Sequence, residues 1–245
     1  MSVPDDTLPE YEDYEYDPYQ EDNTESEYED YIDDTADERP RYRASGSDPT
    51  FGYLIALALA VGLMALPAEY RDLRYTILWL VPAAFGVMAW LMGNTSRIQQ
   101  ETPENLAWGV VFALIVATPL LAVGGSTLTA TITRLFFGMS SGALLAYVVF
   151  VIPLSETLFF RGLLQQERPF WMVGLMSSLW NALIFFPVLD VVSYPAVMTL
   201  IAVALVMMNM IYSYVRQRNG LAAAWLCQIT INLVLIFFPY FTATG

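Results

Sequence analysis

The sequence predicts an all-α protein, a polytopic transmembrane helical bundle of about seven spans that follows an acidic tail. Two observations carry this prediction. Hydrophobic residues make up 56% of the 245 residues, which is above the roughly 45–50% of soluble globular domains. The net charge is nevertheless −14, and it lies at one end, since residues 1–50 contain 18 acidic and three basic residues. We therefore divide the chain into a tail, 1–50, and a transmembrane helical domain, 51–245.

The tail is expected to be disordered, because it has almost no aliphatic residues and its like charges repel one another. Seven of its residues are Tyr. One interpretation is an interaction segment that binds a basic partner or is modified on Tyr. The other is a solvated leader that keeps a hydrophobic chain soluble during synthesis. The pattern of a signal peptide, a charged segment before a short apolar one, is not seen.

Composition restricts the chemistry that the chain can perform. The sequence has no His, all 11 basic residues are Arg, and Cys227 is the single Cys. Zinc sites built on imidazole and Ser–His or Cys–His nucleophile pairs are therefore excluded. We expect no cofactor and no stoichiometric metal. We also expect no nucleic-acid partner, because the chain has no basic patch and its tail would repel phosphates.

The apolar stretches predict membrane helices, because crossing a bilayer of about 30 Å takes roughly 17–25 helical residues. The seven predicted helices lie at about 51–67, 75–93, 106–123, 139–160, 170–189, 195–215 and 220–241. Pro82, Pro119 and Pro153 fall inside helices. Membrane helices tolerate such prolines when neighbours bond the freed carbonyl groups.

The arginines predict the orientation, because cytoplasmic segments of membrane proteins are enriched in Lys and Arg. With the N-terminus inside, eight arginines are cytoplasmic (Arg39, Arg41, Arg43, Arg97, Arg161, Arg168, Arg216 and Arg218) and three are outside (Arg71, Arg74 and Arg134). We therefore expect an integral protein of a prokaryotic inner membrane with a cytoplasmic N-terminus. Its expected partners are membrane lipid and a membrane protein.

Glu156 is the candidate functional residue, because an ionisable group inside a membrane span is costly. Arg161 follows five residues later, about 140° beyond a full helical turn, so it is a poor ion-pair partner and is expected to reach water at the helix end. Gln228 and Asn232 lie four residues apart on one helix face. We expect both, together with Glu156 and Asn181, to line one interior pocket. Asn209 and similar residues are interpreted as hydrogen-bonding contacts between helices.

The stretch Glu156-Thr157-Leu158-Phe159-Phe160-Arg161-Gly162 resembles the first motif, Glu-Glu-x-x-x-Arg, of the CAAX protease and bacteriocin-processing family. These intramembrane proteins are also called Abi proteins or type II CAAX prenyl endopeptidases. The run 177–186 resembles the surroundings of the second motif, Phe-x-x-x-His, with Asn181 and Phe185 at the two motif positions. The run 228–232 fits the third motif, His-x-x-x-Asn. The resemblance covers about residues 139–240.

The resemblance implies the family's helical fold and, at the catalytic positions, Glu156, Arg161, Gln228 and Asn232. In the family a Glu activates water together with two His and an Asn. Here Thr157 replaces the second Glu, Phe185 the first His and Gln228 the second His. Gln can orient a water but cannot take its proton, and Phe can do neither. The resemblance therefore implies the fold, whereas the substitutions argue against proteolysis.

These substitutions leave two function hypotheses. The first is a non-catalytic pseudoprotease that acts as a membrane scaffold or partner-binding protein. The second is an active intramembrane endopeptidase whose altered site is centred on Glu156. A transporter is a weaker third hypothesis, because no inverted repeat is apparent. Under the first hypothesis, we expect a neutral Glu156 whose hydrogen bonds to Gln228 and Asn232 join the fourth predicted helix to the seventh.

Overall fold

The computed structural model describes residues 49–92, 102–189 and 191–244. All regular structure in these residues is helical, and six helices are long and apolar enough to cross a membrane. A seventh apolar helix, Pro49–Ala65, is shorter. The predicted all-α membrane bundle is thereby confirmed. The predicted tail lies outside the described residues except for Pro49 and Thr50, which begin the first helix, and the predicted loop at Arg97 lies outside them as well.

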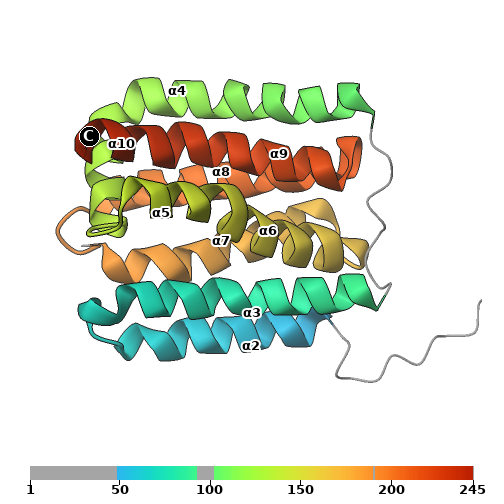
Figure 1. Ribbon diagram of the computed structural model, residues 1–245, viewed down its shortest axis with the longest axis horizontal. Helices are drawn as coiled ribbons and strands as arrows, with labels where there is room; N and C mark the ends of the chain where they lie inside the picture. The colour runs from blue at the N-terminus through green and yellow to red at the C-terminus, as the bar shows by residue number, and fades with distance from the viewer. Residues whose placement is uncertain (1–48, 93–101, 190, 245) are drawn as a thin grey trace, which may run out of the picture. The chain divides into compact units, whose positions relative to one another are not determined.

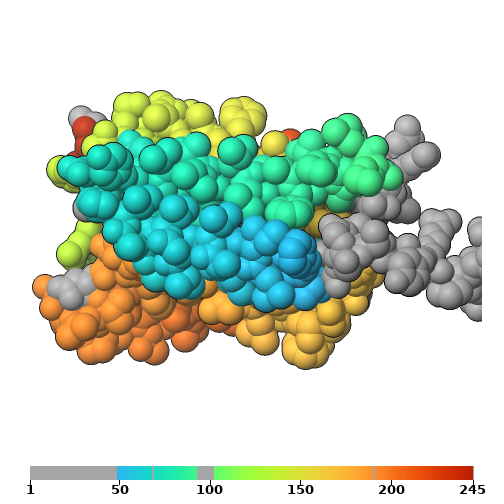
Figure 2. Space-filling view, turned by 90° about the horizontal axis from the view of Figure 1, so that it is seen from below, coloured from blue at the N-terminus to red at the C-terminus, as the bar shows by residue number. Residues whose placement is uncertain are grey.

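The helices lie side by side along one direction (Figure 1). In chain order they are α2 (Pro49–Gly62), α3 (Arg71–Leu91), α4 (Pro103–Leu135), α5 (Ser141–Ala146), α6 (Ile152–Glu156), α7 (Phe170–Phe185), α8 (Pro195–Asn219), α9 (Leu221–Asn232) and α10 (Phe238–Thr244). Single-turn 3₁₀ segments cover Leu63–Ala65, Ala68–Tyr70, Leu164–Gln166 and Phe186–Val188. α2 and α3 pack together on one face (Figure 2).

Two of the membrane helices are composite. The fourth predicted helix consists of α5 and α6 separated by a π-helical segment, Tyr147–Val151, and followed by a second one, Thr157–Leu163. The last helix contains a third, Leu233–Phe237, between α9 and α10. π-Helical turns are rare and often mark functional sites, and here two of them flank Glu156.

α4 is longer than predicted, because it continues to Leu135 rather than ending near residue 123. The Gly and Thr residues that follow residue 123 belong to this helix. In the structure, Thr129 and Thr133 donate hydrogen bonds to the carbonyls four residues earlier, so their hydroxyls are satisfied within the helix. Arg134, which was predicted to lie in a loop, belongs to the last turn of α4.

Small residues allow α4 and α9 to pack closely. Gly109, Ala113 and Ala117 recur every four residues on α4 and are buried. A Cβ atom at Gly109 would overlap the backbone of Ala223 on α9. This is the small-residue packing by which membrane helices approach one another. α8 and α9 are joined by Gly220 alone, whose φ of 104° is accessible to glycine.

The prediction that Arg74 lies in the first loop is also wrong, because Arg74 is a buried residue of α3. Its Nη2 atom donates to the carbonyl oxygens of Leu183 and Ile184, at 3.0 and 3.1 Å. The carbonyl of Leu183 lacks its usual partner because residue 187 is Pro, which has no N–H. The guanidinium therefore completes the hydrogen bonding at the end of α7.

Candidate functional site

Glu156 lies in the interior of the bundle at the C-terminal end of α6, and only 1% of its surface is exposed. Gln228 of α9 donates from Nε2 to Glu156 Oε2 at 2.6 Å. Trp79 of α3 faces the other carboxyl oxygen, with Nε1 at 3.5 Å from Oε1. The carboxyl group is thus held from two neighbouring helices. The predicted hydrogen bond between Glu156 and Gln228 is confirmed.

The Gln228 amide is fixed at both of its ends. Thr157, which follows Glu156 in the chain, donates from Oγ1 to Gln228 Oε1 at 3.0 Å. The amide oxygen therefore accepts from Thr157 while the amide nitrogen donates to Glu156. The residues at two altered motif positions, Thr157 and Gln228, bond to each other and leave the Gln228 side chain no freedom to turn.

Asn232 has a different partner from the one that we predicted. Its Nδ2 atom donates to the carbonyl oxygen of Val148 at 3.2 Å, and no hydrogen bond to Glu156 is found among the described residues. In the π-helical segment that contains Val148, bonds run from residue i to residue i+5. Residue 153 is Pro and cannot donate one. Asn232 therefore satisfies a carbonyl that Pro153 leaves free.

Arg161 is fully buried, so the expectation that it reaches water at the helix end is wrong. Its guanidinium donates to Asn209 Oδ1 at 2.7 Å and to Ser177 Oγ at 3.3 Å. It also lies 5.1 Å from the ring centroid of Tyr212, within the range of cation–π attraction. Arg161 thus ties its own helix to α7 and α8.

The π-helical geometry of Thr157–Leu163 also changes the relation between Glu156 and Arg161. Residues five apart are separated by about one turn when hydrogen bonds run from i to i+5. Arg161 Nη1 accordingly lies 3.5 Å from the backbone oxygen of Glu156. In a regular α-helix, residues five apart lie on different faces, which is why a poor ion pair was predicted.

Asn209 is the site residue whose role sequence reasoning missed. It was interpreted as a general contact between helices, but its Oδ1 atom accepts from both Arg161 and Ser177. Its Nδ2 atom donates to the Leu205 carbonyl, which fixes the direction of the side chain. The sequence did contain a signal for this role. Asn209 is a polar residue within an apolar span, and the Arg161 charge on another span needed a polar partner.

Phe185 is the residue that the resemblance aligns with the first His of the family motifs. Its ring lies 6.5 Å from Tyr75 and 6.3 Å from Trp79, measured between centroids. These distances are typical of aromatic packing in protein cores. The position thus belongs to an apolar aromatic cluster and supplies no proton acceptor beside Glu156.

Glu156, Asn181, Gln228 and Asn232 line one cavity of about 150 Å³, so the predicted interior pocket is confirmed. Its remaining lining is mostly apolar and comes chiefly from α4 and α8, with further side chains such as Ile152 of α6 and Phe185 of α7. Arg161 lies outside this lining and contacts it through Asn209 and Tyr212, which border the cavity. The predicted site residues therefore divide into a cavity group and a separate arginine cluster.

Within the part of the chain that the structure describes, no group of three or more His, Cys, Asp or Glu side chains could hold a metal ion. Cys227 is buried as a free thiol. The donor set beside Glu156 consists of one carboxylate and neutral amides, which transition metals bind poorly. The absence of a bound metal stays a prediction.

Residues 138–234 match a family model described as type II CAAX prenyl endopeptidase Rce1-like. The matched region begins just before α5 and ends within the last membrane helix. No curated protein and no solved structure matches the chain. The resemblance drawn from the three motifs, which covers about residues 139–240, is therefore confirmed over nearly all of that range.

Proposed function

We propose that this CAAX-protease-like membrane protein is a non-catalytic pseudoprotease that binds a membrane partner without cleaving it. The observation that carries the proposal is the continuous hydrogen-bond chain from Thr157 through Gln228 to Glu156. A general base must lie within reach of the proton that it removes. In this site the carboxyl group is instead engaged by the helix that would have supplied a catalytic His.

The neighbouring positions support the same conclusion. Gln228 cannot take a proton from water at neutral pH, and Phe185 is part of an aromatic cluster. The buried amides and hydroxyls form bonds that hold helices together, as polar residues commonly do in membrane proteins. The fold of the family is thus kept while its hydrolytic groups are replaced by structural ones.

A scaffold of this kind would present its partner-binding surfaces in the membrane and use the acidic tail as a handle for a basic partner. The arginine distribution supports an orientation with the tail in the cytoplasm. The membrane that we propose is a prokaryotic inner membrane. The tail charge provides complementarity to a basic protein surface.

One observation favours the alternative, an endopeptidase with an altered site. Glu156 borders the cavity together with Asn232, so a water molecule in the cavity could reach a carboxylate. In that case Gln228 would orient the water and Glu156 alone would act as the base. Arg161 would serve as a positioning residue, because it lies outside the cavity lining.

The experiment that separates the two is a cleavage assay with the full-length protein in vesicles and a prenylated peptide that ends in a CAAX sequence. The pseudoprotease should leave the peptide intact at the same background level as its Glu156→Gln variant. Cleavage by the wild-type protein that Glu156→Gln abolishes would establish the endopeptidase. Elemental analysis of the same sample tests the metal prediction, and one tightly held zinc per chain would contradict it.

A further inference from the structure

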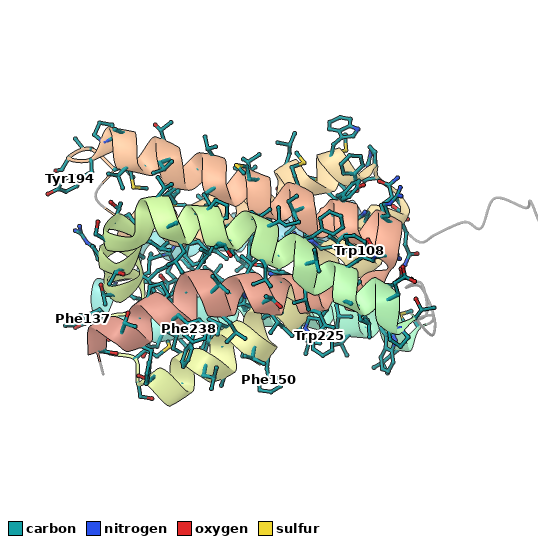
Figure 3. The ribbon with its side chains drawn as sticks, turned by 90° about the horizontal axis from the view of Figure 1, so that it is seen from above. Trp108, Phe137, Phe150, Tyr194, Trp225 and Phe238 are labelled. Atoms are coloured by element: carbon teal, nitrogen blue, oxygen red, sulfur yellow. The ribbon has the colours of Figure 1, made fainter. Side chains whose placement is uncertain are left out.

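A second hollow lies beside the Glu156 cavity. This lateral groove, about 450 Å³ in volume, runs between the C-terminal half of α4 and the beginning of α8. Arg134 and Tyr194 lie in its walls, as do the hydroxyl groups of Thr127 and Thr131. Figure 3 shows the face with α4 in front and Tyr194 at the beginning of α8. Neither Arg134 nor the groove has a role in the proposed function.

The groove and the Glu156 cavity are adjacent hollows, because Thr127, Thr131 and Ile201 line both. Leu200 also lines the cavity, and 53% of its surface is exposed. The path between α4 and α8 therefore opens sideways, toward the position of the bilayer. A molecule entering from the lipid would meet apolar side chains on α8 and hydroxyl groups on α4.

The chemistry changes along this path. At its outer end, Arg134 supplies a permanent positive charge, and Arg71 donates to the Arg134 backbone oxygen at 3.0 Å, which brings a second guanidinium to this end. Further in, the lining is mostly apolar. An apolar cavity of about 150 Å³ accommodates a hydrocarbon of roughly benzene size. A positive entrance followed by a narrow apolar interior is complementary to an anionic amphiphile.

We propose that the lateral groove binds one anionic phospholipid of the surrounding bilayer. Its phosphate contacts Arg134, the Thr127 hydroxyl donates to an ester oxygen, and the end of one acyl chain enters the cavity beside Glu156. Thr131 already donates its hydroxyl proton to the Thr127 carbonyl. Basic pockets between membrane helices bind lipid headgroups by this kind of charge pairing. The proposal does not depend on whether the domain cleaves peptides, since lipid retention is measured without a peptide substrate.

The first test measures which lipids stay bound when the full-length protein is extracted from vesicles of phosphatidylglycerol and phosphatidylcholine. Native mass spectrometry should find one phosphatidylglycerol retained per chain in preference to phosphatidylcholine. Arg134→Gln should lower that preference about five-fold, as expected for the loss of one interfacial arginine. The matched control is Arg218→Gln, an arginine in the last turn of α8, far along the helix from the groove.

Two outcomes of this test would overturn the proposal. An equal loss of preference in Arg134→Gln and Arg218→Gln would show that the lipid is held by charge at any surface. Displacement of the lipid by soluble glycerol phosphate would show a site for free phosphate rather than for a lipid.

The second test blocks the acyl chain. Gly124 lines the cavity, and a Cβ atom there would meet nothing within 4 Å. Gly124→Leu should therefore fold normally and reduce phosphatidylglycerol retention at least as much as Arg134→Gln. Gly125 has equally open surroundings but does not belong to the cavity lining, so Gly125→Leu is the matched control. Equal retention in the two leucine variants, with wild-type thermal stability, would refute acyl-chain entry.

Discussion

At Glu156, a single carboxyl group joins the fourth membrane helix to the last one through Gln228. We expect Glu156→Gln to leave stability nearly unchanged, because an amide oxygen can still accept from Gln228. Glu156→Leu should lower the free energy of unfolding by about 1–2 kcal/mol, because it leaves the buried Gln228 amide without its acceptor. Thermal unfolding in detergent measures both variants, and similar melting temperatures for the two would rule out the structural role.

Arg161 and Asn209 form the second residue-scale contact that can be tested. Replacing either should destabilise the protein by about 2–3 kcal/mol, since hydrogen bonds to buried charged groups are strong and their loss leaves a polar group unpaired. The double variant Arg161→Met/Asn209→Leu should lose less than the sum of the single variants, by about 1–2 kcal/mol. Additive losses in a double-mutant cycle would show that the two residues act independently.

At the scale of helices, Arg74 of α3 bonds the end of α7, where Pro187 frees the Leu183 carbonyl. Arg74→Met should destabilise the protein by about 1–3 kcal/mol, because two buried carbonyls lose their donor. The same substitution should cost distinctly less in a Pro187→Ala background, because the alanine N–H can bond Leu183. Chemical denaturation of the four proteins measures this coupling, and an unchanged cost of Arg74→Met would contradict the explanation.

The contact between α4 and α9 leads to a prediction about small residues. Gly109→Ala should destabilise the protein by about 1–3 kcal/mol, because the new methyl group overlaps the Ala223 backbone. The control is Gly125→Ala, because Gly125 lies on the same helix and a Cβ atom there would meet nothing within 4 Å. It should be neutral or stabilise the helix by up to about 1 kcal/mol. Thermal unfolding compares the two variants, and a tolerated Gly109→Ala would mean that α4 and α9 are further apart.

At the scale of the whole domain, the orientation can be tested with engineered cysteines, because Cys227 is buried and gives little background labelling. Phe137 is exposed just after α4. Gln217 is exposed near the end of α8. This end of α8 lies beside the start of α4, because Asn219 donates a hydrogen bond to Asn105. A membrane-impermeant thiol reagent should label Phe137→Cys from outside the cell and Gln217→Cys from inside. The reverse labelling would invert the predicted topology.

Most of the fold could be predicted because apolar length is a local property of a sequence. Six of the seven predicted helices fulfil the length and hydropathy of a membrane span, and the first is shorter. The main error was the end of α4, which was predicted near residue 123 and lies at Leu135. Its continuation depends on hydroxyl bonds to carbonyls one turn earlier, which a lipid environment favours over unsatisfied polar groups.

The site could be predicted only in part. Residue type and four-residue spacing placed Gln228 and Asn232 on one face and directed both toward Glu156. The partner of Asn232 could not be predicted, because it depends on a carbonyl that Pro153 frees in a π-helical segment. The cluster of Arg161 with Asn209 joins positions 48 residues apart, and no local pattern specifies such a contact.

The sequence by itself determined the membrane bundle, the cavity residues and the absence of His, because each follows from residue types and their spacing along the chain. The tertiary structure decided which polar groups satisfy one another. Only the packed helices show that Thr157 and Gln228 hold Glu156, and that Arg161 is buried rather than exposed to water. The physical reason is that a buried polar group must find a partner wherever the packing provides one.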